Sequence, residues 1–362
     1  MFNVSADNLD DLMGLVFKKL LSNRGVFRVE STKGKSTEVF EALLELKNPR
    51  ARLSRSQTRA RIFSAIGELI WYLAGEESID FIEYYIPGYR NFSNDGKIAS
   101  GAYGPRLFGL KAGLRKKNQS EWNKMISTLR RREGSRNALI QIYSNSDAYD
   151  DNKDRPCTCS LHFVIRNSKL HLHVHMRSND AYKGLPHDIF SFTMLQEIAS
   201  CELGLELGTY QHSVASLHLY DDETNNQKGV LHQTRTNAKK FLDEGLHDFK
   251  PMPNMPKEDP WISIEELIIA EKNIRAGNID FNDFKNTSPY WKDFAILLKI
   301  HSVFEMEDKK AKSTPNYSRK LIPINELSKS ISSSVYKIYI LDKLVKKSKT
   351  DLTLFNYGNI EG

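Results

Sequence analysis

Cys157 is the residue of this sequence best suited to covalent chemistry. It follows a proline in Arg155-Pro156-Cys157-Thr158, at the entrance of a segment predicted to be a strand. The thiolate is the nucleophilic form of cysteine, and the neighbouring Arg155 favours that form. A single cysteine is more often an inert, small apolar side chain, so this segment alone is compatible with both interpretations.

A second segment is suited to holding a phosphate. Arg177 and Ser178 stand at the end of a predicted strand, where they offer a guanidinium fork and a hydroxyl. Gly184-Leu185-Pro186 then predicts a tight turn that leads into a helix. A surface ion pair followed by an ordinary turn is the alternative.

Three histidines, His171, His173 and His175, alternate along one predicted strand and therefore share one of its faces. Such spacing is compatible with a metal site, but no carboxylate or cysteine at matching spacing completes one. We therefore expect a polar sheet face and no bound metal.

The elements that must position these residues predict an α+β fold, with helices packed on a mixed sheet and no regular βαβ order. Apolar residues at helical spacing predict helices over residues 7–24, 61–74 and 190–201. Alternating and β-branched residues predict strands over 37–46, 138–143, 160–166, 170–176 and 211–220. Glu68 lies in the middle of the second helix, and 87–105 is predicted to be an irregular loop.

The composition argues against a membrane protein and against a disulfide-rich protein. No run reaches the roughly 18 consecutive apolar residues of a membrane span, and the start is acidic where a signal peptide is basic. Three cysteines do not make a disulfide framework, so we expect a cytoplasmic protein. The net charge of +7 and the pI near 9.0 are compatible with a phosphorylated small molecule or nucleic acid as partner, and equally with a merely basic surface.

Six segments together resemble motifs of the thymidylate synthase family, in the family's order, over about residues 20–225. They are Glu68-Leu69-Ile70-Trp71-Tyr72-Leu73, Gly101-Ala102-Tyr103-Gly104, Pro156-Cys157, Met176-Arg177-Ser178-Asn179-Asp180, Gly184-Leu185-Pro186 and Leu217-His218-Leu219-Tyr220. The resemblance implies a thymidylate synthase-like sheet with packed helices.

The domain organisation follows from this match and from the later helices. A helix is predicted from Asp259-Pro260 to Gly277, because aspartate caps a helix, proline suits its first turn and glycine ends it. The polar segment from about 308 is predicted to be a loop. We predict a catalytic domain over 1–308, with core motifs in 20–225 and a divergent helical part in 226–308. A mostly helical C-terminal extension of unknown role follows over 309–362.

The resemblance implies an enzyme that transfers a one-carbon group to C5 of a pyrimidine nucleotide. Cys157 would add to C6 of the base, which makes C5 nucleophilic enough to attack the methylene group of methylenetetrahydrofolate. Glu68 would manage protons at the ring through ordered water, and Tyr103 would assist the proton transfer at C5. Cys159 is expected to be structural.

By the same resemblance, Arg177 and Ser178 bind the nucleotide 5′-phosphate, and His218 and Tyr220 hold the sugar 3′-hydroxyl. These residues would make the protein a binder of a pyrimidine nucleoside monophosphate, with no requirement for nucleic acid.

Arg136 matches an arginine that family members lend across a two-fold dimer interface, which implies a homodimer. Asn137 stands where the family has a second arginine, and Lys33 is the counterpart of an early phosphate-binding arginine. Lysine keeps the charge but lacks the two-pronged geometry of a guanidinium group. We therefore expect a phosphate site with fewer arginine contacts than is usual in the family.

Asp188 is the departure that bears on the base. Family members acting on uracil have an asparagine here, whose amide pairs with N3–H and O4. A carboxyl group accepts from the amino group of cytosine and, when protonated, donates to its N3, as in the branch of the family that acts on cytosine nucleotides. We therefore predict a cytosine base, with a helix-capping aspartate as the alternative.

Other departures bear on the folate and the product. Asp180 is predicted to meet the folate pterin, and Gly184 and Tyr89 are predicted to line the same site. Tyr89 is the best counterpart of a tryptophan that shields the intermediate in methylating members. The family's C-terminal closing segment is absent from 357–362. A site that closes less tightly would let water trap the intermediate and give a hydroxymethyl group.

The sequence thus predicts hydroxymethylation of CMP or dCMP with methylenetetrahydrofolate. One alternative is a C5-methylating synthase that acts on dCMP or dUMP. Another, from a different class, is a catalytically inactive regulator that binds a nucleotide or RNA, which the Lys-rich C-terminal segment favours and the intact set of Cys157, Glu68 and Tyr103 disfavours.

Overall fold

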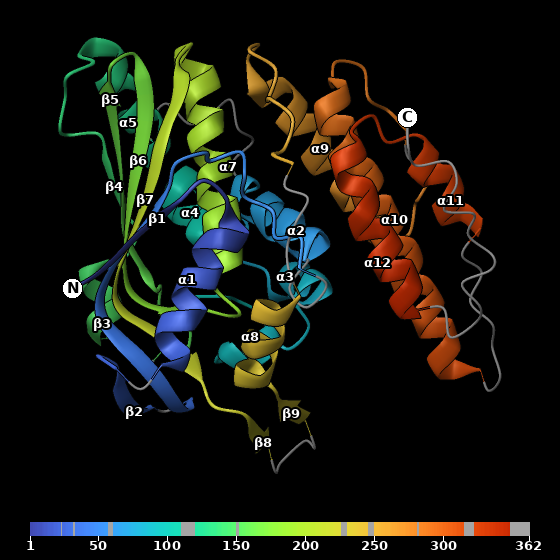
Figure 1. Cartoon of the computed structure of the whole chain (residues 1–362). Helices are drawn as coiled ribbons and strands as arrows, with labels where there is room; N and C mark the ends of the chain where they lie inside the picture. Colours follow the sequence, from blue (N-terminus) through green and yellow to red (C-terminus); the bar gives the residue numbers. More distant parts are fainter. Residues whose placement is uncertain are drawn as a thin grey trace.

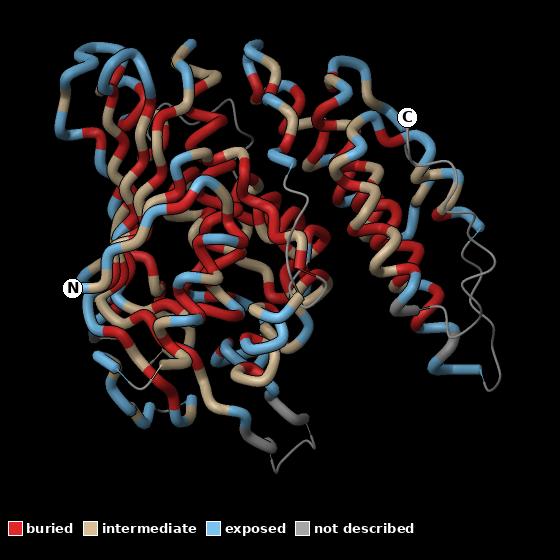
Figure 2. Tube along the Cα trace, in the orientation of Figure 1, coloured by how far each residue is buried: buried red, intermediate tan, exposed pale blue. Residues whose placement is uncertain are grey.

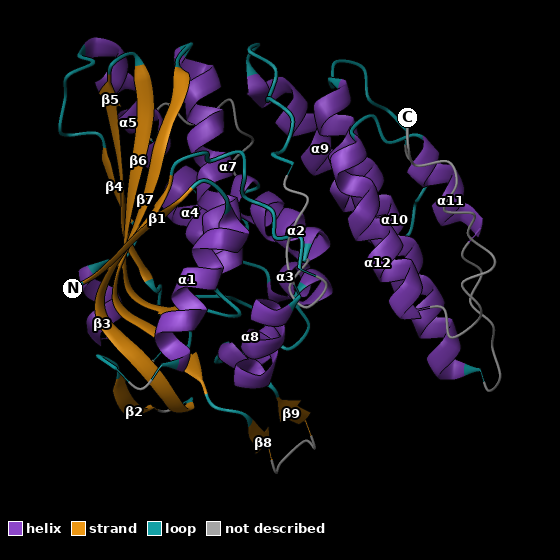
Figure 3. Cartoon of the chain, in the orientation of Figure 1, coloured by secondary structure: helices purple, strands orange, loops and turns teal. Residues whose placement is uncertain are grey.

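The computed structural model describes residues 1–22, 24–31, 33–56, 61–109, 120–149, 152–225, 230–244, 250–280, 282–314 and 322–347. Within these residues a seven-stranded mixed sheet carries helices on one face, and a helical C-terminal region lies beyond them (Figures 1 and 3). The α+β class and the helical C-terminal region predicted from the sequence are confirmed. No helix in this part of the chain is long and apolar enough to cross a membrane.

The sheet combines parallel and antiparallel neighbours. In spatial order its strands are β1 (Phe2–Ala6), β3 (Gly34–Leu46), β7 (Glu206–Tyr220), β6 (Lys169–Asp180), β5 (Thr158–Arg166) and β4 (Leu139–Gln141), and β2 (Phe27–Ser31) also pairs with β3. The β1–β3 and β6–β7 pairs are parallel, and the others are antiparallel. A separate two-stranded ribbon is formed by β8 (Glu223–Asn225) and β9 (Val230–His232).

The helices form two layers beside the sheet. Those nearer the sheet are α1 (Leu9–Leu21), α2 (Ile62–Leu73), α3 (Ile79–Tyr85), α4 (Tyr103–Phe108), α5 (Glu121–Arg131), α6 (Asn145–Tyr149), α7 (Leu185–Leu203) and α8 (Thr234–Asp243), with the short helix η1 (Tyr89–Phe92). The outer layer holds α9 (Pro260–Arg275), α10 (Pro289–Ser313), α11 (Ile322–Lys329), η3 (Ser334–Tyr336) and α12 (Lys337–Lys347). Figure 2 shows the buried residues concentrated between the sheet and these helices.

The two faces of the sheet differ because side chains alternate along each strand. On β6, Leu172 and Val174 face the helices and are fully buried. His171, His173 and His175 lie on the other face, where His175 is exposed and the other two are half-buried. The polar sheet face predicted from the histidine spacing is therefore present.

Two helices bring the chemistry-bearing segments to the sheet. Helix α2 is apolar nearly all round, so it is buried on most sides, and its central Glu68 is half-buried. Helix α7 has Pro186 in its first turn and ends at Gly204, whose φ of 69° is the left-handed conformation that glycine adopts easily. Because α7 connects the parallel strands β6 and β7, the start of α7 lies at the end of β6.

Several elements differ from the sequence prediction. Strands β1 and β2 were not predicted, because each depends on pairing with β3 rather than on a strong pattern of its own. The segment predicted to be an irregular loop over 87–105 contains η1 and the start of α4. The polar segment from 308 continues α10 as far as Ser313 instead of forming a loop, since its lysines lie on an exposed helix face.

The C-terminal helices share the main core. Tyr336 and Ile340 are fully buried in the same apolar cluster as α2 and α7. On α12, Lys343 lies over the Phe63 ring of α2, 4.6 Å from its centre, and approaches Nδ1 of His301 to 3.0 Å. Residue 308, where we divided the chain, therefore falls within a continuous helix, and residues 348–362 lie outside the described part.

Candidate active site

The half-buried Cys157 sits directly before β5. Its carbonyl oxygen accepts a hydrogen bond of 2.9 Å from the backbone N–H of Arg177, which ties the nucleophile to the end of β6. Burial raises the pKa of the Cys157 thiol, whereas the positive charges of Arg177 and Lys33 act in the opposite direction. The thiolate is thus opposed by desolvation and favoured by two nearby cations.

The side chain of Arg177 holds the turn that carries Cys157. Its Nε donates to the Pro156 carbonyl oxygen at 2.9 Å, and Nη2 donates to that of Arg155 at 3.3 Å. The guanidinium carbon also lies 6.0 Å from the centre of the Tyr143 ring. Arg177 is exposed, so this arginine orients the nucleophile turn while its outer edge faces solvent.

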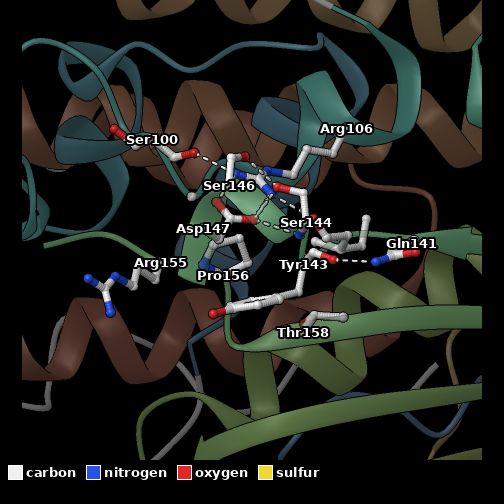
Figure 4. Close-up of polar contacts among 12 residues, drawn as sticks. Ser100, Arg106, Gln141, Tyr143, Ser144, Ser146, Asp147, Arg155, Pro156 and Thr158 are labelled. Atoms are coloured by element: carbon white, nitrogen blue, oxygen red, sulfur yellow. Dashed lines mark hydrogen bonds and ion pairs between the residues drawn. The ribbon is translucent and has the colours of Figure 1, made fainter. Parts of the chain in front are cut away.

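An ion pair joins α4 to α6 near the nucleophile turn (Figure 4). Arg106 donates to both carboxylate oxygens of Asp147, at 2.5 and 2.7 Å, and also to the carbonyls of Ser100 and Ile142. Asp147 in turn accepts from the backbone N–H of Ser144 at 2.7 Å. Arg106 and Asp147 thereby tie together the backbone at Ser100, Ile142 and Ser144.

Tyr72 links Glu68 to Tyr103, which lies next to the nucleophile. The Tyr72 hydroxyl donates to Glu68 Oε1 at 2.9 Å, and the rings of Tyr72 and Tyr103 lie 5.2 Å apart. The Tyr103 hydroxyl accepts from the backbone N–H of Thr158, next to Cys157, at 3.3 Å. Burial raises the pKa of the Tyr103 hydroxyl well above its usual range, and the charges of Asp188 and Cys157 act in the same direction. Tyr103 is therefore a neutral hydroxyl beside the thiol.

Tyr89 also belongs to this group, although it lies in a segment where no helix was predicted. Its ring packs edge-on against Trp71 at 5.7 Å. Burial raises the pKa of its hydroxyl well above the usual range, with further effects of Asp154, Glu68, Tyr103 and Cys157. Asp154, which the sequence analysis missed, accepts from the Gly101 N–H at 3.2 Å, and burial raises the pKa of its carboxyl. Only its position, three residues before Cys157, could have suggested it.

Asp188 lies in the first turn of α7 and is buried. Its Oδ2 accepts from Asn179 Nδ2 at 2.7 Å. Burial raises the pKa of the Asp188 carboxyl well above its usual range, and the charge of Glu68 adds to this effect. Gly184 leaves room for the bond, because a Cβ there would lie 2.9 Å from Asn179 Nδ2 and 3.4 Å from Asp188 Oδ2. Burial thus favours the protonated form of Asp188.

The remaining residues predicted to bind the nucleotide lie on β6, on β7 and between β2 and β3. His218 and Tyr220 are two residues apart at the C-terminal end of β7, with ring centres 4.9 Å apart. Ser178 is half-buried on β6, opposite Ser216 of β7. Lys33 lies over the Phe92 ring at 4.6 Å, and its charge reaches Cys157.

Asp180 makes hydrogen bonds with the backbone of its own turn, and Arg136 lies near His162. Asp180 Oδ1 accepts from the backbone N–H groups of Tyr182 and Lys183 at 2.8 and 2.9 Å, which shapes the turn into α7. Arg136 is exposed near β4, and its carbonyl lies 3.0 Å from His162 Nε2. Within the described part of the chain, no recorded contact joins the Arg136 side chain to the residues around Cys157.

The order of these elements and the cysteine turn held by an arginine agree with one protein family. The family model described as Thymidylate synthase matches residues 18–250. The chain belongs to the thymidylate synthase family. Members of this family transfer a one-carbon unit to C5 of a pyrimidine nucleotide, and the match covers every predicted site residue.

Curated relatives include two branches of the thymidylate synthase family. The chain is 31% identical to the deoxyuridylate hydroxymethyltransferase of Bacillus phage SP01 over 201 residues, which are 51% of each protein. It is 29% identical to the deoxyuridylate hydroxymethyltransferase of Delftia phage PhiW-14 over 221 residues, 57% of this chain and 59% of the relative. Identity to the thymidylate synthase of Bacillus atrophaeus is 26% over 198 residues, 52% of this chain and 87% of the relative. The chain thus spans about half the length of the first two.

The thymidylate synthase family uses methylenetetrahydrofolate, and the described residues offer a compatible surface. Tyr89, whose ring packs on the buried Trp71, is close enough to Cys157 to interact with its charge, and the carboxylate of Asp180 stands at the turn into α7. A planar, hydrogen-bonding ring fits such a combination. No group of three or more histidine, cysteine, aspartate or glutamate residues in the described part of the chain is arranged to hold a metal ion.

Proposed function

We propose that this protein hydroxymethylates C5 of a cytidine monophosphate, with CMP or dCMP as substrate. The observation that carries the proposal is the grouping of Cys157, Tyr103 and Glu68 with the buried carboxyl of Asp188. A nucleophile, a neutral hydroxyl and a carboxylate are the groups needed to add to a pyrimidine ring and move its protons. The buried Asp188 supplies the hydrogen-bonding edge that distinguishes cytosine from uracil.

The proposed chemistry begins with the thiolate of Cys157. Its sulfur forms a bond to C6, and the electron pair of the C5–C6 double bond moves onto C5 and the C4 substituent. Tyr103 then assists the proton transfer at C5, and Glu68 exchanges protons with the ring through water. Methylenetetrahydrofolate supplies the methylene carbon when it is bound, with Asp180, Tyr89 and Gly184 proposed to line its site.

The same proposal assigns the phosphate and the sugar. Arg177, Ser178 and Lys33 would bind the 5′-phosphate, and His218 and Tyr220 would hold the 3′-hydroxyl. Arg136 is exposed and remote from the other residues, which supports its donation to a second copy in a homodimer. Such a dimer would leave each site incomplete without the other chain.

A second candidate, hydroxymethylation of dUMP, is favoured by the relatives. Two of them are named deoxyuridylate hydroxymethyltransferase, which supports a hydroxymethyl product but points to uracil. The deciding experiment is mass spectrometry of the products from CMP, dCMP, UMP and dUMP with methylenetetrahydrofolate. We expect a hydroxymethylated cytosine nucleotide together with tetrahydrofolate. Formation of dihydrofolate with a methylated product would refute hydroxymethylation, and a hydroxymethylated uracil nucleotide alone would refute the choice of base.

A further inference from the structure

A chain of buried polar side chains ends on Asp188. The Tyr210 hydroxyl lies 2.7 Å from His212 Nδ1, and His212 Nε2 lies 3.1 Å from Asn179 Oδ1. Asn179 Nδ2 then donates to Asp188 Oδ2 at 2.7 Å. Tyr210 and His212 are fully inaccessible to solvent, and Asn179 is 4% exposed. We call Tyr210, His212 and Asn179 the buried relay.

The direction of the hydrogen bonds in the buried relay is fixed. Burial lowers the pKa of His212 to about 3, and the nearby His173 and His175 act in the same direction, so the imidazole is neutral and has one N–H. Among the residues that the structure describes, His212 is the only hydrogen-bond partner of the Tyr210 hydroxyl. A buried hydroxyl without an acceptor is unfavourable, so Tyr210 donates to Nδ1. His212 must then donate from Nε2 to Asn179 Oδ1.

The consequence is an oriented amide beside Asp188. With its oxygen occupied by His212, Asn179 can only present its NH2 group to Asp188 Oδ2. If Asn179 were flipped, its NH2 group would face the N–H of His212 and its oxygen would face Oδ2. Asp188 Oδ2 is thus held as an acceptor, and a proton on this carboxyl resides on Oδ1.

We propose that the buried relay decides which carboxyl oxygen of Asp188 carries the proton, and thereby which pyrimidine base the site accepts. This inference rests on the proposed function, in which Asp188 contacts the base. A neutral carboxyl group by itself is symmetric, since either oxygen can hold the proton. It can therefore pair with the acceptor–donor edge of cytosine or, with the proton moved, with the donor–acceptor edge of uracil. Holding the proton on one oxygen removes that freedom.

The variant that tests the relay is Tyr210→Phe, because it removes one hydroxyl at the end farthest from the base. His212 can then adopt either tautomer, Asn179 can flip, and both oxygens of Asp188 become able to carry the proton. We expect the ratio of kcat/KM for cytosine nucleotides to that for uracil nucleotides to fall by about fivefold to a hundredfold, the range for one mispaired buried polar group. Tyr336→Phe is the matched control, since its hydroxyl is also buried and has no hydrogen-bond partner among the described residues. It should leave the ratio unchanged.

Two further measurements separate the possible failures. Nitrogen-15 NMR of labelled histidine should show His212 as the Nε2–H tautomer in the wild type and as a mixture in Tyr210→Phe. A tautomer that does not change, or a selectivity ratio that stays within about twofold while activity falls equally for both bases, overturns the relay. Asp188→Asn tests the proposed function itself: if it changes the base preference but Tyr210→Phe does not, the relay alone is wrong. If neither variant changes the preference, the base-reading role of Asp188 is wrong as well.

Discussion

Replacing Asp147 by asparagine tests how much the ion pair with Arg106 stabilises the fold. Arg106 and the two hydrogen bonds from Ser144 lower the pKa of the Asp147 carboxyl from 3.8 to about 2, against the opposing effect of burial. A lowered folded-state pKa stabilises the protein above the unfolded-state pKa, and that contribution is lost as the pH falls through the folded-state value. At about 1.4 kcal/mol per pKa unit, the ionised carboxylate contributes about 2 kcal/mol at neutral pH.

The asparagine amide cannot ionise, so Asp147→Asn should lower the free energy of unfolding by about 2 kcal/mol at pH 7. A further pH-independent loss of roughly 1 kcal/mol is expected, because the NH2 group would face the N–H of Ser144. Urea denaturation of both proteins at several pH values between 7 and 3 measures the difference. The gap should be constant down to about pH 5 and should narrow below pH 4.

The control is an aspartate in an exposed ion pair with arginine. The side chains of Asp80 and Arg90 are 79% and 48% exposed, so Asp80→Asn should change stability by no more than about 1 kcal/mol. If the difference in unfolding free energy between the wild type and Asp147→Asn is the same at pH 7 and pH 3, the ion pair with Arg106 does not stabilise the fold. Equal effects of the two variants would lead to the same conclusion.

Three predictions concern the reaction. Cys157→Ser should abolish tritium release from C5-labelled nucleotide while nucleotide binding persists, and Cys159→Ser should keep most activity. The opposite result would show that Cys159, not Cys157, is the nucleophile. Asp188→Asn should shift the kcat/KM preference from cytosine toward uracil nucleotides by roughly one to two decades. Wild-type binding of cytosine nucleotides should weaken as the pH rises, because the Asp188 carboxyl must keep its proton to donate to the base. Mixing inactive Arg136→Ala with inactive Cys157→Ser should partly restore activity if the site is shared between two copies, and no recovery would argue for complete sites within single chains.

The sequence predicted the elements whose patterns are local. Helix α2 was found because its apolar residues recur at helical spacing, and α9 because Asp259 and Pro260 mark its start. Asp259 indeed accepts from the backbone N–H of Trp261 at 3.1 Å. Strand β1 was missed because its five residues are held by parallel pairing with β3. No local sequence pattern predicts such a contact.

Only the site residues that lie in short sequence motifs were predicted. Cys157, Glu68 and Asp188 could be identified from short segments, but the relay residues Tyr210 and His212 could not, since they meet Asp188 only through tertiary contacts. One signal was available. His212 occupies an inward-facing position of β7 between Tyr210 and Val214, and a buried histidine in an apolar alternation implies a hydrogen-bond partner.

The contact between α12 and α2 has a consequence for synthesis on the ribosome. Helix α2, which carries Glu68, is made early, yet Lys343 covers its Phe63 ring only after nearly the whole chain has been translated. Until α10, whose His301 and Phe304 also pack on Phe63, and then α12 have been made, the outer side of α2 exposes apolar surface. Such exposure favours aggregation and chaperone binding in nascent chains. A contact between residues so far apart in the sequence also slows folding. Residues late in the sequence thereby determine when a residue of the reaction centre acquires its final surroundings.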